Sequence, residues 1–201
     1  MKIERYLVEI KGTRPLLMNA PNAFGTKKRR SEVEDPEEEA KKRLYRNPYT
    51  NEICVPAINI EAMLRDAGRN YKMQGRRATY SAYIKSGIRV EPEYVPLKVP
   101  NGDPEKAWKV DARIVSVQRK SSKVIRYRPR FDHWGLEFTI INYDPNILKR
   151  EMIERILVDA GRWYGLCDYR PRFGLFEVVK FEVVEREKAE KELNSLENFI
   201  E

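Results

Sequence analysis

The sequence predicts an α+β fold with one antiparallel sheet, built in the order strand, helix, strand, strand, helix, strand. This order rests on four apolar segments of strand length and on two segments whose apolar residues recur at helical spacing. A further observation is that the five residues YRPRF occur at 127–131 and again at 169–173, each time just before an apolar strand. The element order is that of the ferredoxin-like (βαββαβ) arrangement.

The first half of the chain supplies the first two strands and the first helix. Residues 2–13 alternate imperfectly between apolar and polar side chains, which predicts a strand. A helix is predicted from Asn59, a capping residue, to about Tyr71, and a second helical piece is predicted at about 76–85. Residues 88–99 follow as a strand, and the two prolines within it predict a position at the edge of the sheet.

The second half supplies the remaining core elements and one hairpin. Residues 110–118 and 123–128 flank a short basic turn, which predicts a hairpin that projects between core elements. Residues 133–143 form a strand, and residues 147–164 have the clearest helical spacing of apolar side chains. Residues 175–184 supply the last strand of the sheet.

This reading predicts a single ferredoxin-like domain over residues 1–184. Insertions are expected at about 19–56, as a loop and helix, at 72–87, as a helical segment, and at 110–130, as the basic hairpin. An amphipathic helix is predicted at residues 185–201. This helix either packs on the sheet of its own chain or docks a partner. Its apolar residues are Leu193, Leu196, Phe199 and Ile200.

Composition excludes several classes of protein. The 201 residues contain 41% hydrophobic residues, enough for one sizeable core, but neither a membrane-length apolar run nor a secretory leader. We therefore expect a cytoplasmic protein without membrane contact. Cys54, Cys167 and one histidine cannot complete a zinc site, and both thiols are expected to be reduced and packed inside. No cofactor motif is present, and 35% charged residues fit a thermophile.

The charge distribution predicts a polyanionic partner. The net charge is +8, and residues 185–201 are net negative, so the rest of the chain carries +11. Between residues 113 and 130 there are seven basic residues and no acid, and between 65 and 77 five basic residues accompany only Asp66. Such blocks are typical of nucleic-acid-binding surfaces. The alternative is a thermophilic surface that is simply rich in lysine and arginine.

The topology predicts that the two YRPRF copies lie close together. The ferredoxin-like sheet has the strand order fourth, first, third, second, so the third and fourth strands run parallel with the first strand antiparallel between them. Both copies then enter the sheet at the end where the first strand leaves it through Arg14 and Pro15. Strands separated by one neighbour are about 10 Å apart, so the copies flank this exit.

Each copy is expected to be a stiff, extended edge with two faces. Proline fixes its own φ and favours an extended arginine before it, so Arg128 and Arg130 share a face, as do Arg170 and Arg172. Arginine binds phosphate oxygens and tyrosine stacks on unpaired bases. The alternative is that the arginines pair with local acids such as Asp132 and Asp168 and the aromatic residues are core. The aromatic residues, expected to point the other way, are Tyr127, Phe131, Tyr169 and Phe173.

The glycine-bounded segment GLCDYRPRFG at 165–174 resembles the C-terminal glycine-rich loop of the RAMP superfamily, the ferredoxin-like RNA-binding proteins of CRISPR systems. Cys167 stands where another glycine is expected. The resemblance implies single-stranded nucleic-acid binding across the sheet and loops, in a multi-subunit assembly, and it implies that the hairpin reaches along the nucleic acid. The segments GTRPLLMN (12–19), VPAINIEAML (55–64), WGLEFTI (134–140) and GLCDYRPRFGLFEV (165–178) are also similar to uncharacterised proteins of phages and mobile elements.

We therefore expect binding of single-stranded RNA or DNA, mainly through the backbone and largely independent of sequence, by a homo-oligomer or a subunit of a multi-subunit complex. RNA and DNA both remain open, since a 2′-hydroxyl contact needs no particular residue type. The expected binding residues are Arg14, Arg65, Arg69, Arg76, Arg77, Arg113, Arg119, Lys120, Lys123, Arg126, Tyr127, Arg128, Arg130, Tyr169, Arg170 and Arg172.

No catalytic residue and no metal site is predicted. His133 follows Asp132, but neighbouring residues of a strand point to opposite faces, which disfavours an imidazole oriented by that carboxylate. The alternative function is a metal-independent endoribonuclease of the RAMP type, and a scaffold that docks partners through residues 185–201 is another. The residues considered for the nuclease are Tyr71, Lys72, Arg76 and Tyr80.

Overall fold

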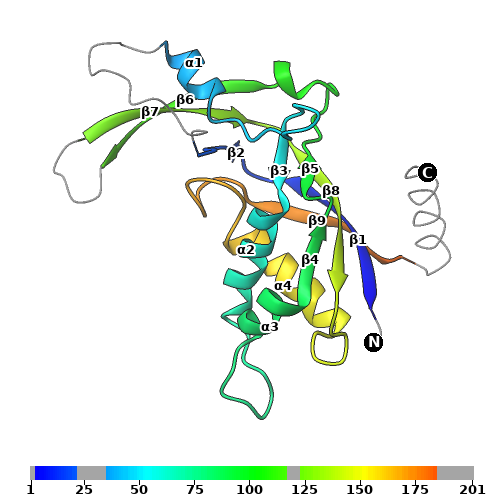
Figure 1. Ribbon diagram of the computed structural model, residues 1–201. Coiled ribbons are helices and arrows are strands. Elements are labelled where there is room, and N and C mark those ends of the chain that lie inside the picture. The colour runs from blue at the N-terminus through cyan, green and yellow to red at the C-terminus, as the bar shows by residue number, and fades with distance from the viewer. Residues whose placement is uncertain (1–2, 22–34, 117–122, 185–201) are drawn as a thin grey trace, which may run out of the picture.

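The computed structural model describes residues 3–21, 35–116 and 123–184 (Figure 1). Its main sheet has four antiparallel strands in the order β4, β8, β1, β9. Strand β1 pairs antiparallel with both β8 and β9, so these two run parallel to each other. The strand order predicted from the sequence is confirmed. The strands are β1 (Glu4–Gly12), β4 (Ile88–Glu91), β8 (Gly135–Asn142) and β9 (Phe176–Val183).

Helices α2 (Ala57–Gly68) and α4 (Arg150–Trp163) pack against each other and cover one face of this sheet, with α3 (Tyr80–Gly87) beside α2. Alternation along β1 buries Tyr6, Val8 and Ile10 against the helices. Each large apolar side chain that is fully buried contributes roughly 1.5–3 kcal/mol to folding. The buried residues of α4 are Ile153, Ile156, Leu157, Ala160 and Gly161.

Helices α2, α3 and α4 begin at other residues than the sequence predicts. Helix α2 begins directly after Pro56, whose fixed φ suits the residue before a helix, and not at Asn59. Helix α3 begins after Thr79, and α4 begins after Lys149, because the amides of Ile147 and Leu148 bond to Asp144 in a preceding turn.

The predicted strand at 88–99 is divided in two. Its first part is β4, which lies at the edge of the main sheet, as its prolines predict. Its second part, β5 (Tyr94–Pro96), pairs with β3 (Cys54–Pro56) in a separate two-stranded sheet. A 3-10 turn, η1 (Pro104–Lys106), leads from β5 toward the hairpin.

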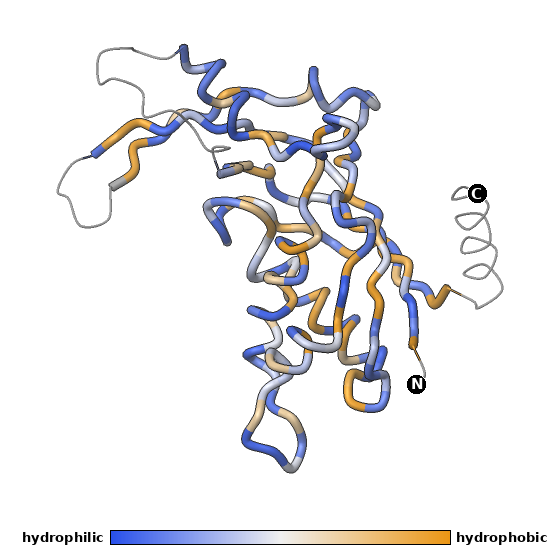
Figure 2. The backbone as a smooth tube through the Cα atoms, viewed as in Figure 1, coloured by the Kyte–Doolittle hydropathy of each residue, from blue (hydrophilic) through white to orange (hydrophobic). Residues whose placement is uncertain are grey.

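The predicted hairpin is present as β6 (Trp108–Ser116) and β7 (Lys123–Phe131), and it projects from the body of the molecule (Figure 1). A short strand β2 (Leu16–Leu17) joins its base in a three-stranded sheet of order β2, β7, β6, and helix α1 (Pro36–Lys41) packs on the hairpin. Apolar and polar residues both occur along each arm (Figure 2). The register places Arg126, Arg128 and Arg130 on one face and Ile125 and Tyr127 on the other.

The open face of the main sheet carries both signs of charge, which does not favour binding of a polyanion across it. Glu9 lies opposite Glu137 on one neighbouring strand and Lys180 on the other. The residues at the end of the sheet where β1 ends differ, because four arginines lie there around a hollow that no acid lines. The charged residues that share this face are Arg5, Glu9, Lys11, Arg89, Glu91, Glu137, Glu177, Lys180 and Glu182.

Some predictions fall outside the described residues. These are the helix at 185–201, the hairpin turn with Arg119 and Lys120, and most of the loop that begins at residue 19. Across the described residues, no helix has the length and apolar character needed to cross a membrane.

Candidate functional site

Strand β2 holds the two YRPRF copies on either side of the exit from β1. Leu16 pairs with Phe131 of the first copy. On its other side, the amide of Gly174 donates to the carbonyl of Pro15 at 2.8 Å, and the amide of Asp168 donates to the carbonyl of Leu17 at 2.9 Å. The predicted convergence of both copies with Arg14 and Pro15 is confirmed.

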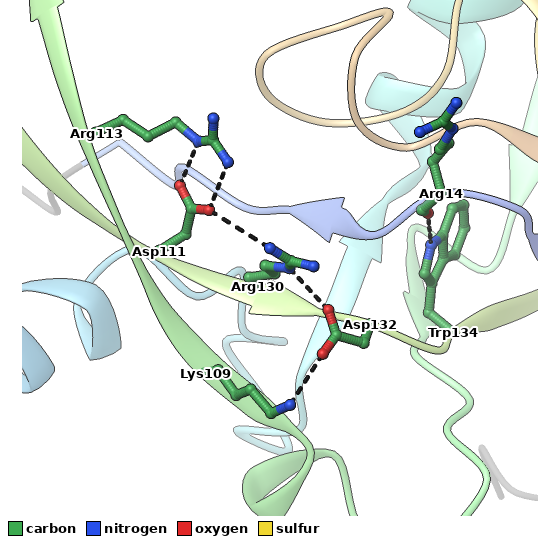
Figure 3. Close-up of polar contacts among 7 residues, drawn as sticks. All are labelled: Arg14, Lys109, Asp111, Arg113, Arg130, Asp132 and Trp134. Atoms are coloured by element: carbon green, nitrogen blue, oxygen red, sulfur yellow. Dashed lines mark hydrogen bonds and ion pairs between the residues drawn. The ribbon is translucent and has the colours of Figure 1, made fainter.

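Trp134 holds the backbone of Arg14 at this exit. Its indole Nε1 donates to the carbonyl of Arg14 at 2.8 Å (Figure 3), and its own carbonyl accepts from the amide of Gly12 at 2.8 Å. A Cβ on Gly12 would lie 2.1 Å from that Nε1, so the indole packs there only because residue 12 is glycine. The contacts of the buried Trp134 thus hold the backbone after β1 in place, and this backbone determines where the Arg14 side chain starts.

The loop at 165–174 is closed by backbone contacts, so residues 169–173 within it are not extended as predicted. The amide of Leu166 donates to the carbonyl of Gly174 at 2.9 Å, and Gly165 and Gly174 have φ values of 75° and 74°. Cys167 and Tyr169 are also in the left-handed region, with φ values of 60° and 59°. Position 167 therefore has the backbone conformation that favours the glycine expected there.

The second YRPRF copy is consequently a turn, and its side chains do not alternate. Arg172 lines a hollow on the side of Arg14, whereas Arg170 lies on the other side with its Nη2 3.7 Å from Asp66 Oδ2. The prediction that Arg170 and Arg172 share a face is wrong, because it assumed an extended strand.

Four arginines surround a hollow of about 440 Å³, the arginine hollow, and no acid lines it. They come from the exit of β1, from both arms of the hairpin and from the glycine-bounded loop. Among the described residues, Arg14 and Arg172 have no ion pair, so both guanidinium groups are available to an anion. The lining residues are Arg14, Pro15, Arg113, Arg130, Pro171, Arg172, Phe173 and Leu175.

Two aspartates bind the other two arginines of the hollow (Figure 3). Asp111, which is 8% exposed, accepts from Nε and Nη2 of Arg113 at 2.6 and 2.9 Å. Asp132 accepts from Arg130 Nε at 2.7 Å and from Lys109 Nζ at 3.0 Å. A guanidinium group has five N–H donors, so a carboxylate that accepts one or two of them leaves the others for a ligand.

Asp132 makes the stability of the folded chain depend on pH in the acidic range. The hydrogen bond from Lys109, and a second from Arg130, hold the pKa of Asp132 below its usual value. The resulting stabilisation is complete above the unfolded pKa of about 3.9 and is lost as pH falls through the lower folded value. We expect thermal unfolding of Asp132→Asn to depend less steeply on pH between about pH 5 and pH 2 than that of the wild type. Equal slopes would contradict this assignment.

Arg128 is buried, so it does not fit the role of an exposed phosphate ligand. It is 8% exposed, and its Nε lies 2.9 Å from Asp168 Oδ2 in an ion pair that joins the first copy to the loop of the second. Its guanidinium carbon also lies 6.0 Å from the centre of the Tyr169 ring. For Arg128 and Arg130 the alternative of pairing with Asp168 and Asp132 is correct, although Arg130 still lines the arginine hollow.

A second hollow of about 680 Å³, the aromatic hollow, lies on the other side of the loop. Two aromatic side chains in its lining are exposed, Trp163 by 69% and Tyr169 by 43%. Sequence reasoning missed Trp163, for which the available signal was an aromatic residue just before the glycine-bounded loop. It also missed Asp111, the acid that immediately precedes the basic run. The lining residues are Asp66, Arg69, Asn70, Trp163, Tyr164, Cys167, Asp168, Tyr169, Arg170 and Pro171.

The remaining expected binding residues do not line the arginine hollow. Arg65 and Arg69 line a third hollow, of about 590 Å³, together with Lys85. Arg76 donates to the hydroxyl of Tyr83 at 2.8 Å, and Arg77 is exposed nearby. On the hairpin, Arg126 lies opposite Arg113, Lys123 is exposed, and Tyr127 is on the face away from the arginines.

The catalytic candidates are not organised for proton transfer. Both oxygens of Asp132 accept from Arg130 and Lys109, so this carboxylate does not orient the exposed His133. Burial, and a hydrogen bond donated to Asp159, raise the pKa of Tyr71, which keeps its phenol neutral. Tyr80 is half-buried and packs against the core, and Lys72 is exposed.

The two cysteines are not activated, and the described residues contain no metal-binding cluster. Burial raises the pKa of Cys54 to about 11 and that of Cys167 to about 12, so both are neutral thiols near pH 7. Both are free thiols, and Cys54 is buried as expected, whereas Cys167 is half-buried. No group of three or more His, Cys, Asp or Glu side chains suited to a metal ion occurs in residues 3–21, 35–116 and 123–184.

Comparison with known proteins identifies the fold. No family model matches the chain, and no curated protein matches it. Its structure is similar to a chain in the cryo-EM structure of the Type III-B Cmr-beta bound to cognate target RNA, with a TM-score of 0.58 and 15% sequence identity. The match covers 92% of this chain and 61% of that chain, so this chain spans less than two thirds of its neighbour's length. The predicted α+β fold class is confirmed.

Proposed function

We propose that this protein binds a single strand of RNA or DNA through its phosphate backbone, as one subunit of a larger assembly. The observation that carries this proposal is the arginine hollow, where Arg14, Arg113, Arg130 and Arg172 converge without an acid in the lining. The solved structure with a similar fold is bound to target RNA, which supports RNA as the first ligand to test.

The geometry suits a flexible polyanion better than a small apolar ligand. A guanidinium fork binds phosphate oxygens through two parallel hydrogen bonds, and the arginines of the hollow come from three separate segments of the chain. Asp111 holds Arg113 in place before a ligand arrives, which lowers the entropy lost on binding. Contacts of this kind attract phosphates whatever the base sequence.

The test is the binding of labelled single strands of mixed sequence at increasing salt. A single strand loses affinity with a slope of about −0.7 in log salt for each phosphate that is neutralised, so four contacts weaken binding about 50-fold between roughly 50 and 200 mM salt. Fluorescence anisotropy with RNA, DNA and duplex of the same sequence measures both the slope and the strand preference. Absence of binding at low salt, or an affinity that does not change with salt, would show that the proposal is wrong.

A further inference from the structure

We infer that the aromatic hollow binds an unpaired base of the same strand whose phosphates bind in the arginine hollow. The inference rests on the proposed function and adds a base-binding site to it. The two hollows share Pro171, which lines both, so the tip of the 165–174 loop is a ridge between them. Arg172 lies on the phosphate side of this ridge and Arg170 on the other.

The lining of the aromatic hollow supplies the surfaces that a base needs. Trp163 ends helix α4 and is 69% exposed, and Tyr169 of the loop is 43% exposed. Exposed aromatic rings beside a cationic site provide stacking platforms for unpaired bases. Trp163 is the more open of the two, since the guanidinium carbons of Arg113 and Arg128 already lie 5.6 and 6.0 Å from the centre of the Tyr169 ring. The volume of about 680 Å³ lies within the range of small-molecule sites.

Polar groups in the same lining match the edge of a base. Asp66 and Asp168 supply carboxylate oxygens, although each is already in an ion pair, Asp66 with Arg170 and Asp168 with Arg128. Asn70 supplies an amide whose Nδ2 donates to the hydroxyl of Tyr164 at 2.7 Å. Single-stranded bases are recognised by stacking together with hydrogen bonds to their Watson–Crick or Hoogsteen edges. The arginine hollow differs, since arginine is the only polar residue type in its lining. We therefore expect phosphates of the strand to bind in the arginine hollow and one of its bases to bind in the aromatic hollow.

The test combines a protein variant with a change in the ligand. Wild type and Trp163→Ala are titrated at low salt with a single strand, and with a strand of equal length in which every nucleotide is abasic. We expect the variant to bind the normal strand about 5- to 150-fold more weakly, the range for loss of one stacked base, and to bind the abasic strand as the wild type does. Trp163→Phe retains a ring and should recover most of the affinity.

Tyr49 supplies the matched control, because it is an aromatic residue with 85% exposure that lines neither hollow. Tyr49→Ala should bind both strands as the wild type does. The inference is overturned if Trp163→Ala binds the normal strand as tightly as wild type, or loses equal affinity for both strands. It is also overturned if a nucleoside monophosphate binds wild type as tightly as the strand, since the hollow would then be a mononucleotide site. Failure of wild type to bind either strand would instead reject the proposed function.

Discussion

Replacing Gly174 with alanine is expected to lower the free energy of unfolding by about 3 kcal/mol. The added Cβ would lie 2.1 Å from the carbonyl oxygen of Leu166, and Gly174 has a φ of 74°. The loop is closed at this point by the amide of Leu166, which donates to the carbonyl of Gly174. A left-handed backbone costs a side-chain-bearing residue about 1–3 kcal/mol, and overpacking costs a similar amount. For a chain of this size the loss corresponds to a melting temperature lower by about 6–12 °C, measurable by calorimetry or by urea unfolding.

Gly102→Ala separates the two causes. Gly102 has a φ of 70°, close to that of Gly174, but nothing lies within 4 Å of its added Cβ. This variant should therefore show only the backbone cost, about 1–2 kcal/mol. If the two variants are equally destabilised, the contact between Gly174 and Leu166 does not restrict the loop as the structure indicates.

Removing the two arginines of the hollow that have no ion pair among the described residues is expected to weaken strand binding about 100-fold. The double variant Arg14→Ala/Arg172→Ala deletes donors from two segments that meet at the hollow. A charge-assisted hydrogen bond contributes about 1.5 kcal/mol or more, which is about tenfold in affinity for each arginine. The salt slope should fall by about 1.4, because two phosphate contacts are lost. Anisotropy titrations at several salt concentrations measure both quantities.

The matched control removes the same charge elsewhere. Arg5 and Arg89 lie on the open face of the main sheet, near the end opposite the hollow, and Arg5→Ala/Arg89→Ala leaves the same net charge as the first variant. This control should lose little affinity and retain the wild-type salt slope. If both double variants weaken binding equally, attraction depends on total charge, and the arginine hollow is not the site.

Much of the fold follows from patterns that are local in the sequence. Alternating apolar residues and helical spacing identify the strands and helices of the core, and the handedness and connection rules for this element order leave the strand order that is observed. The meeting of residues near Arg14, Arg130 and Arg172 follows from that order, since it places the ends of the first, third and fourth strands together.

The structure differs from the sequence-based expectations where a conformation depends on contacts with residues that are distant in the sequence. The second YRPRF copy has the same letters as the first, but the contact of Leu166 with Gly174 makes it a turn, whereas the first copy pairs as a strand. The open face of the main sheet, across which the resemblance implies binding, carries both signs of charge, because acids and bases on different strands lie beside one another there. Neither outcome is visible within a window of a few residues.

The sequence by itself determined the fold class, the order of the sheet and the end of the sheet at which the two repeats meet, because hydrophobic periodicity and connection rules act along the chain. Only the tertiary structure decided which arginines are available. Asp168 pairs with Arg128, and Asp111 holds Arg113, whereas Arg14 and Arg172 have no ion pair among the described residues. The energy of interaction between two charges depends on the distance between them and on how deeply they are buried, and both are properties of the folded chain.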